Sequence, residues 1–182
     1  LYAVKQSIER AAESKVELLI IHGDSPNAAA GIINGRKTVL VNFAMLDMVG
    51  KDMHQWAALI GHEIAHIELH HQDKRAGRKI PLIITQSNIL SRSDNLLTEL
   101  LSDLAVKGVS SAYSREDERD ADYLGAIWAV EAGYNPYGAV TLQENLLKSH
   151  GSHPIPFLST HPSGTERIKS LQSLAERLPR SE

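Results

Sequence analysis

The chain has 182 residues, of which 42% are hydrophobic, and a formal net charge of -3 at pH 7. This length and apolar fraction are sufficient for one hydrophobic core, so we expect a single domain over residues 1–182. The charge balance shows no basic surplus, which argues against nucleic acid as the main partner. The chain has no cysteine, which excludes disulfides, cysteine-ligated zinc and a thiol nucleophile. A bound metal would need His, Asp or Glu ligands.

The first part of the chain predicts one helix and a small sheet. Apolar residues at helical spacing predict a helix over residues 1–14. Residues 16–21 are rich in Val, Leu and Ile and predict a buried strand, and residues 37–41 predict a second one. Residues 27–32, which lie between these two, are a candidate third strand.

Helices are predicted for most of the remaining chain, and a loop over residues 149–162 precedes the last of them. Helical spacing of apolar residues predicts helices at 52–75, 94–107, 114–132 and 136–148. A last helix is expected to begin with the capping-box pattern Ser163-Gly164-Thr165-Glu166. The predicted fold class is therefore α+β, mainly α, with a small N-terminal β-sheet.

The strongest chemical signal is the motif His62-Glu63-Ile64-Ala65-His66 in the predicted helix 52–75. Residues four apart lie one turn apart on the same helix face, so His62 and His66 are candidate ligands of one metal ion. Glu63 projects about 100° around the helix axis from His62, which places it beside the metal. This position suits a general base that activates water, so Glu63 is the candidate catalytic residue.

A catalytic zinc generally has three protein ligands, so a third ligand is needed. A metzincin would have Gly at position 69 and His at position 72, where this chain has Leu69 and Gln72, and that class is excluded. His70 lies about 6 Å further along the helix than His66, beyond easy chelation. His70 and His71 are expected to be solvated residues near the helix end.

The predicted helix 114–132 offers the best third ligand. Glu118 and Asp122 are four residues apart and therefore share one helix face. One carboxylate on this face could bind the metal while the other accepts a hydrogen bond from the ring of a ligating histidine. Glu116 is the next candidate for the metal. The alternative is a solvated acidic helix start, which the helix dipole favours.

Four segments, in order, resemble the gluzincin metalloendopeptidases of the HtpX heat-shock protease and CAAX prenyl protease family, which includes mitochondrial Oma-type and periplasmic lipoprotein relatives. The segments are Pro26-Asn27-Ala28, then Gly61-His62-Glu63-Ile64-Ala65-His66 with His71, then Ser114-Arg115-x-x-Glu118-x-x-Ala121-Asp122-x-x-Gly125 continued by Ala132-Gly133-Tyr134-Asn135-Pro136, and Thr160-His161-Pro162 with Arg167-Ile168. The resemblance implies a zincin-like helical core, Glu118 as third ligand, Asp122 as the supporting carboxylate and one Zn²⁺ per chain.

The same resemblance supplies candidates around the metal. It places His161 near the zinc, where His161 is a candidate catalytic group that stabilises the oxyanion, although it could equally anchor its loop. Arg167 could orient that loop or bind a carboxylate and is a candidate substrate-binding residue. Asn27, Ala28 and Ala29 are further substrate-binding candidates, because a sheet edge can add an extended polypeptide as a strand.

These features predict a zinc-dependent endopeptidase that hydrolyses misfolded or membrane-associated proteins through a zinc-activated water. The alternative is a zinc-stabilised, non-proteolytic chaperone-like module that binds unfolded polypeptides. Glu63 argues against it, because a purely structural zinc site has no use for a base. A metalloprotease of DNA-bound proteins would require a third His ligand and a basic surface, which the composition does not show.

Membrane-embedded members of this family carry membrane spans between the two metal-binding helices, whereas residues 81–109 are amphipathic and too charged here. The chain begins at Leu1, so we expect a missing N-terminal leader or anchor and possible proximity to a membrane. The predicted location is the cell envelope, periplasmic or attached to a membrane and facing the periplasm. In a eukaryote it would be the mitochondrial inner membrane. The sequence predicts no oligomeric state.

Overall fold

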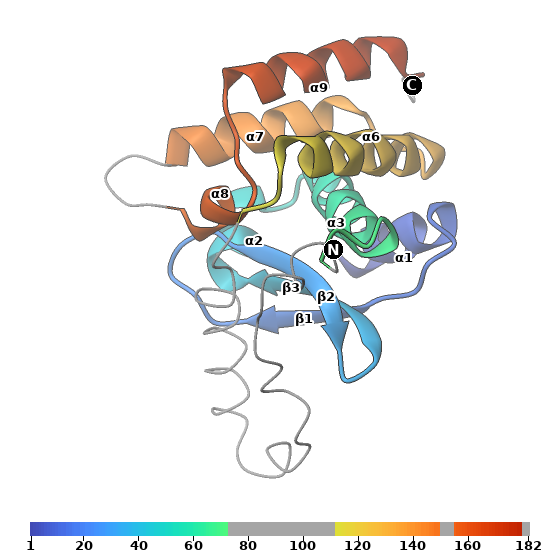
Figure 1. Ribbon diagram of the computed structural model, residues 1–182, viewed down its shortest axis with the longest axis vertical. Coiled ribbons are helices and arrows are strands. Elements are labelled where there is room, and N and C mark those ends of the chain that lie inside the picture. Colours follow the sequence, from blue (N-terminus) through green and yellow to red (C-terminus); the bar gives the residue numbers. More distant parts are fainter. Residues whose placement is uncertain (73–111, 150–154, 180–182) are drawn as a thin grey trace.

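The computed structural model describes residues 1–72, 112–149 and 155–179 (Figure 1). The chain begins with helix α1 and a sheet whose elements are α1 (Tyr2–Ala11), β1 (Glu17–Ile21), β2 (Ala28–Ile33) and β3 (Arg36–Asn42). The sheet has the order β1-β3-β2, with β1 parallel and β2 antiparallel to β3. Asn34 and Gly35, with φ of 51° and 75°, form the tight turn between β2 and β3. The candidate third strand is thus confirmed.

The helices follow, and their bounds are α2 (Phe43–Val49), α3 (Met53–Glu68), α6 (Arg115–Glu131), α7 (Tyr137–Ser149), α8 (Pro156–Thr160) and α9 (Thr165–Arg177). The α+β, mainly α class is confirmed. The predicted helix 94–107 lies outside the described residues. Helix α2 was not predicted. Asn42 is the last residue of β3 and also caps α2, because its side chain accepts a hydrogen bond from the Met45 amide.

Two expectations for the C-terminal part were wrong. The segment predicted to be a loop contains the short helix α8, which begins with Pro156 in its first turn, where proline is tolerated. Helix α9 has no capping box, because Gly164 occupies the N-cap position and has no side chain to accept a hydrogen bond. Ser163 therefore lies one residue too early to cap the helix.

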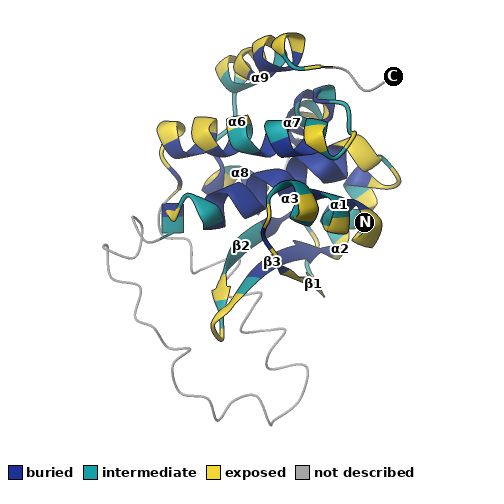
Figure 2. Ribbon diagram, turned by 90° about the vertical axis from the view of Figure 1, so that its right-hand side faces the viewer, coloured by how far each residue is buried: buried dark blue, intermediate teal, exposed yellow. Residues whose placement is uncertain are grey.

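Helix α3 runs through the centre of the fold, with the sheet and α1 on one side, α6 and α7 on the other, and α9 outermost (Figure 1). Every residue from Gln55 to Ile67 is buried, and Figure 2 shows α3 almost wholly in the buried colour. A helix that is buried on all sides belongs in a core, and apart from Gln55 the buried polar residues of α3 are those of the metal motif. Asp52 caps its start by accepting hydrogen bonds from the amides of His54 and Gln55.

Helices α3 and α6 cross at a pair of glycines. A Cβ atom on Gly125 would lie 2.7 Å from the backbone N of His62, and one on Gly61 would lie 2.8 Å from the Gly125 carbonyl oxygen. Any side chain at either position would push the helices apart. The crossing is therefore close enough for side chains of α6 to reach those of α3.

Helix α3 ends seven residues earlier than the predicted helix 52–75. Its last residue is Glu68, and His70 follows with φ of 53°. This left-handed conformation is uncommon outside glycine, although His adopts it more readily than most residues. Because His70 breaks the helix, His71 does not continue along the helix surface. Among the helices of the described ranges, none is long and apolar enough to cross a membrane.

Candidate metal centre

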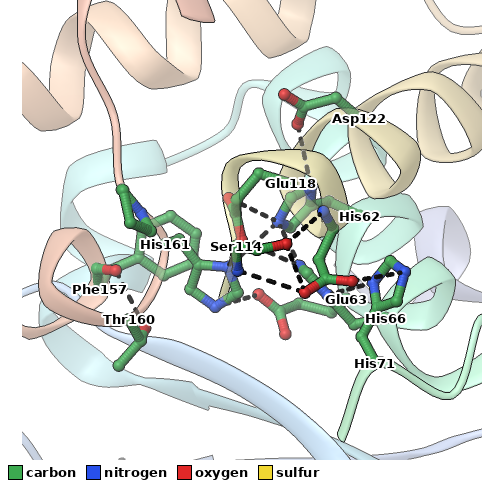
Figure 3. Close-up of polar contacts among 12 residues, drawn as sticks. His62, Glu63, His66, His71, Ser114, Glu118, Asp122, Phe157, Thr160 and His161 are labelled. Atoms are coloured by element: carbon green, nitrogen blue, oxygen red, sulfur yellow. Dashed lines mark hydrogen bonds and ion pairs between the residues drawn. The ribbon is translucent and has the colours of Figure 1, made fainter. Parts of the chain in front are cut away.

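Two helices supply the three predicted ligands (Figure 3). His62 and His66 lie on α3, and Glu118 lies in the first turns of α6, whose start is fixed by a capping box between Ser114 and Asp117. All three ligand residues are at most 5% exposed. Burial of these polar groups would be costly without a common partner, which indicates a shared binding function.

The ligand atoms have the spacing of a tetrahedral zinc site. Nε2 of His66 lies 3.0 Å from Nε2 of His62 and 3.3 Å from Oε1 of Glu118, and Nε2 of His62 lies 3.6 Å from Oε2 of Glu118. Zinc–ligand bonds of about 2.0–2.1 Å at tetrahedral angles separate neighbouring ligand atoms by about 3.3 Å. Two imidazoles and one carboxylate therefore fit one zinc ion in donor type and in spacing.

His161 brings a fourth nitrogen to the same point. It lies between α8 and α9, and its Nδ1 is 3.2 Å from Nε2 of His62 and 3.0 Å from Oε1 of Glu118. These four residues form a group whose ligand atoms all lie within 4.8 Å of one another. His161 is thus a fourth candidate donor at a site where a catalytic zinc ion would keep one corner of its tetrahedron for water. Its ring stacks on Phe157 with centroids 4.4 Å apart.

Glu63 lies beside this group and is fully buried. Among the described residues, neither of its carboxylate oxygens has a hydrogen-bond partner. Its Oε1 lies 3.5 Å from Nε2 of His161. A buried carboxylate without hydrogen bonds is costly, so its place is explained by a group that joins it in the working protein, such as water.

Asp122 holds the second nitrogen of His62. Its Oδ1 lies 3.0 Å from Nδ1 of His62, and Arg167 donates two hydrogen bonds of 2.8 Å to the same carboxylate. Arg167 also pairs with Oε2 of Glu118 and donates to the Pro162 carbonyl oxygen at 3.3 Å. This one guanidinium therefore joins the third ligand, the supporting carboxylate and the loop that carries His161.

Burial and neighbouring charges set the protonation states. Burial opposes ionisation of Glu118, but His161, His62 and His66 hold the pKa of its carboxyl well below the usual range. Burial also disfavours the charged form of Asp122, yet Arg167 and His62 keep its pKa low. Burial and the adjacent His62 lower the pKa of His66 well below 6.5. These groups therefore hold the ionised or neutral forms that bind a metal at neutral pH.

His62 differs from His66. Burial lowers its pKa, but the hydrogen bond to Asp122 and the charge of Glu118 outweigh burial and raise the pKa above its usual value of 6.5. A metal that binds His62 therefore competes with a proton that is held more strongly than on a free imidazole.

The solvated position expected for His71 is wrong. Its side chain is 1% exposed, and its Nδ1 lies 3.0 Å from Nδ1 of His66. The early end of α3 turns His71 back towards the site. Tyr113 was also missed, and its ring stacks on His66 with centroids 3.7 Å apart. The sequence feature that could have identified His71 is its position five residues after His66. Nothing in the sequence singled out Tyr113.

The substrate-binding candidates Asn27, Ala28 and Ala29 lie at the start of β2, outside the metal group. Asn27 is buried, and its amide donates a 3.0 Å hydrogen bond to Oδ1 of Asn42. Its carbonyl oxygen accepts from the Asn42 amide at 3.1 Å. Asn27 therefore anchors the strand to β3, whereas Ala28 is the first residue of the outer strand.

Residues 3–175 match peptidase family M48. The chain is also 29% identical over 162 residues to the mitochondrial metalloendopeptidase OMA1 of Schizosaccharomyces pombe, covering 87% of this chain and 46% of that protein. It is 30% identical over 175 residues to the human metalloendopeptidase OMA1, covering 88% of this chain and 33% of the relative. The metalloprotease LoiP of Escherichia coli is 28% identical to the chain over 120 residues, which cover 63% of this chain and 47% of LoiP.

The chain spans about half or less of the length of these curated relatives. The family match, in contrast, covers nearly the whole chain and includes both metal-binding helices. The buried donor set fits the zinc that metallopeptidases of this kind use. The chain belongs to peptidase family M48.

Proposed function

We propose that the chain is a zinc-dependent endopeptidase, in which His62, His66 and Glu118 bind one zinc ion. The observation that carries this proposal is the buried carboxylate of Glu63, which has no hydrogen bond within the described part of the chain and lies beside a ligand set with tetrahedral spacing. A structural site has no use for such a base, which argues against the chaperone-like alternative. The M48 match and the metalloendopeptidase relatives support the same activity.

Zinc bound in such a site lowers the pKa of a water molecule and polarises a carbonyl group. Glu63 then accepts a proton from the water and can return it to the leaving amine nitrogen. Asp122 fixes the ring of His62, and Arg167 holds Asp122 and Glu118 in place. Because both carboxylate partners of Arg167 belong to the site itself, we propose that it positions these groups and does not bind substrate.

Replacement of Glu63 by Gln tests the catalytic base. Gln has the same shape but cannot accept the proton, so kcat for cleavage of an unfolded protein is expected to fall by about 10²–10⁴-fold. Zinc content should stay at one per chain, as measured by mass spectrometry of metals. Glu116→Gln, an exposed change on α6, is the control. Full activity of the zinc-loaded Glu63→Gln variant would disprove the mechanism.

We further propose that His161 stabilises the oxyanion once its ring leaves the corner that water must take. Its contacts with His62, Glu118 and Glu63 place an N–H donor at the reacting centre. His161→Phe keeps a flat ring next to Phe157 but removes the donor. Because loss of one oxyanion donor costs about 10²–10³ in kcat, we expect a decrease of that size with zinc affinity changed less than about tenfold. A larger loss of zinc affinity, measured by chelator competition, would instead show that His161 is a permanent zinc ligand.

For substrate binding we propose the free edge of β2. Asn27 directs its N–H and C=O towards β3, so Ala28 and Ala30 direct theirs to the opposite side of the strand. In the sheet of the described residues, β2 is an outer strand. An extended polypeptide could pair with these groups with little sequence preference.

Ala30→Pro removes one N–H from this edge without breaking the ladder to β3, as proline is tolerated on edge strands. Loss of one main-chain hydrogen bond of about 1 kcal/mol predicts a KM for an unfolded polypeptide about threefold to tenfold higher. The zinc affinity should not change. Ala30→Val, which keeps the N–H, is the matched control. Equal KM values for the two variants would exclude pairing at this position.

The substitution Asp122→Asn tests whether Asp122 holds the ring of His62 in place. The amide keeps the shape but loses the charge that holds the imidazole and pairs with Arg167. Loss of such a supporting group costs about 10–100-fold in metal affinity, which competition with a chromophoric chelator measures. Asp120→Asn, an exposed change two residues away, should leave the affinity unaltered. Equal affinity in both variants would show that Asp122 does not support the site.

The substrate class and the location are also proposals. We propose misfolded or membrane-associated polypeptides as substrates, and a cell envelope, or the mitochondrial inner membrane in a eukaryote, as the location. Two relatives are named as mitochondrial metalloendopeptidases, which supports the mitochondrial part of this proposal. Fractionation of the source cells tests the location, and recovery of the protein in the cytosol alone would contradict it.

A further inference from the structure

The two proposed histidine ligands of α3, His62 and His66, each contact a further group on the ring side away from the metal group, and the two groups differ. His62 contacts Asp122, which in turn contacts Arg167. His66 instead contacts His71: the two Nδ1 atoms lie 3.0 Å apart, and Nε2 of His71 lies 3.4 Å from Oδ1 of Asp117. The rings of His66 and His71 are 0% and 1% exposed.

This arrangement allows one distribution of protons on the two rings. His66 directs its Nε2 towards the metal ligands, so its proton must be on Nδ1. That N–H can donate to Nδ1 of His71 only when Nδ1 of His71 carries no proton. The proton of a neutral His71 is then on Nε2, on the side of Asp117. The chain of contacts thus selects the tautomer of His66 that binds zinc.

Asp117 is itself held by the start of α6. Its Oδ2 accepts hydrogen bonds from the amide and the hydroxyl of Ser114, at 3.2 Å and 2.8 Å, which leaves Oδ1 facing His71. Tyr113, one residue earlier, stacks on His66 at an interplanar angle of 19°. The first turn of α6 therefore carries the third ligand Glu118 and also the group that ends the contact chain from His66.

We propose that His71 and Asp117 are positioning residues that fix the ring orientation and tautomer of His66, as Arg167 and Asp122 do for His62. This rests on the ligand set proposed above. The left-handed conformation of His70 is what makes it possible, because it turns the chain out of α3 and brings His71 behind His66.

The test compares His71→Phe, His71→Asn and Asp117→Asn with the wild-type chain. Phe removes the acceptor, so zinc affinity is expected to fall by about 10–100-fold, the usual cost of losing such a group. Asn places an amide oxygen near the position of Nδ1 and should restore much of this loss. In Asp117→Asn the amide nitrogen can face the N–H of His71, and two donors cannot form a hydrogen bond. The series of contacts from His66 through His71 to residue 117 is then interrupted, and zinc affinity should again fall. His70→Asn, at an exposed position where Asn suits the left-handed conformation, is the control.

A purely structural role would give a different result. We therefore measure the visible absorption spectrum of the cobalt-substituted proteins at saturating cobalt, together with the melting temperature of the metal-free proteins. The proposal expects an altered spectrum in His71→Phe and in Asp117→Asn. A variant with a lower melting temperature but a wild-type spectrum and wild-type zinc affinity would overturn the proposal. If His71→Phe does not fold, the spectrum and zinc affinity of Asp117→Asn provide the test.

His66→Ala separates this proposal from the one on which it rests. If His66→Ala binds zinc as tightly as the wild-type chain, the ligand set itself is wrong. If His66→Ala loses zinc while His71→Phe and Asp117→Asn bind it normally, only the positioning role of His71 and Asp117 is wrong.

Discussion

The close crossing of α3 and α6 is the constraint on which the metal centre depends. The ligands come from two helices, and ligand atoms around one zinc ion must lie about 3.3 Å apart. Gly61 and Gly125 satisfy this requirement because a Cβ atom at either position would lie within 3 Å of the other helix's backbone. With the helices in contact, Glu118 reaches His62 and His66 across the interface. The capping box at the start of α6 and the contacts of Asp122 and Arg167 then hold the side chains of the site in place.

The same crossing buries charge, and the site is organised to tolerate it. Glu63, Glu118 and Asp122 bring three carboxyl groups to this region, and Arg167 pairs with two of them. The double positive charge of a zinc ion would balance the excess of negative charge. Metal binding and folding are therefore expected to be coupled, because the ligands come together only in the folded chain. Arg167 and the neighbouring histidines favour the ionised forms of Asp122 and Glu118 and keep the pKa values of both carboxyl groups low.

The sequence predicts the elements with strong periodicity and the residues with fixed helical spacing. Spacing alone could not decide between Glu118 and Glu116 as ligand, and burial favours the proposed Glu118, which is 2% exposed, whereas Glu116 is exposed. His71 was misplaced because the helix was extended to residue 75, and no glycine or proline marks its end at Glu68. The short helices α2 and α8 escaped prediction because 5 to 7 residues are too few for a periodic signal.

The most direct test of this account is to locate the metal in a crystal by anomalous scattering at the zinc absorption edge. The account predicts one zinc ion per chain, bonded to Nε2 of His62, Nε2 of His66 and a carboxylate oxygen of Glu118, with Glu63 beside it and unbonded. A zinc ion bound elsewhere, or one bonded to Glu116 in place of Glu118, would contradict it.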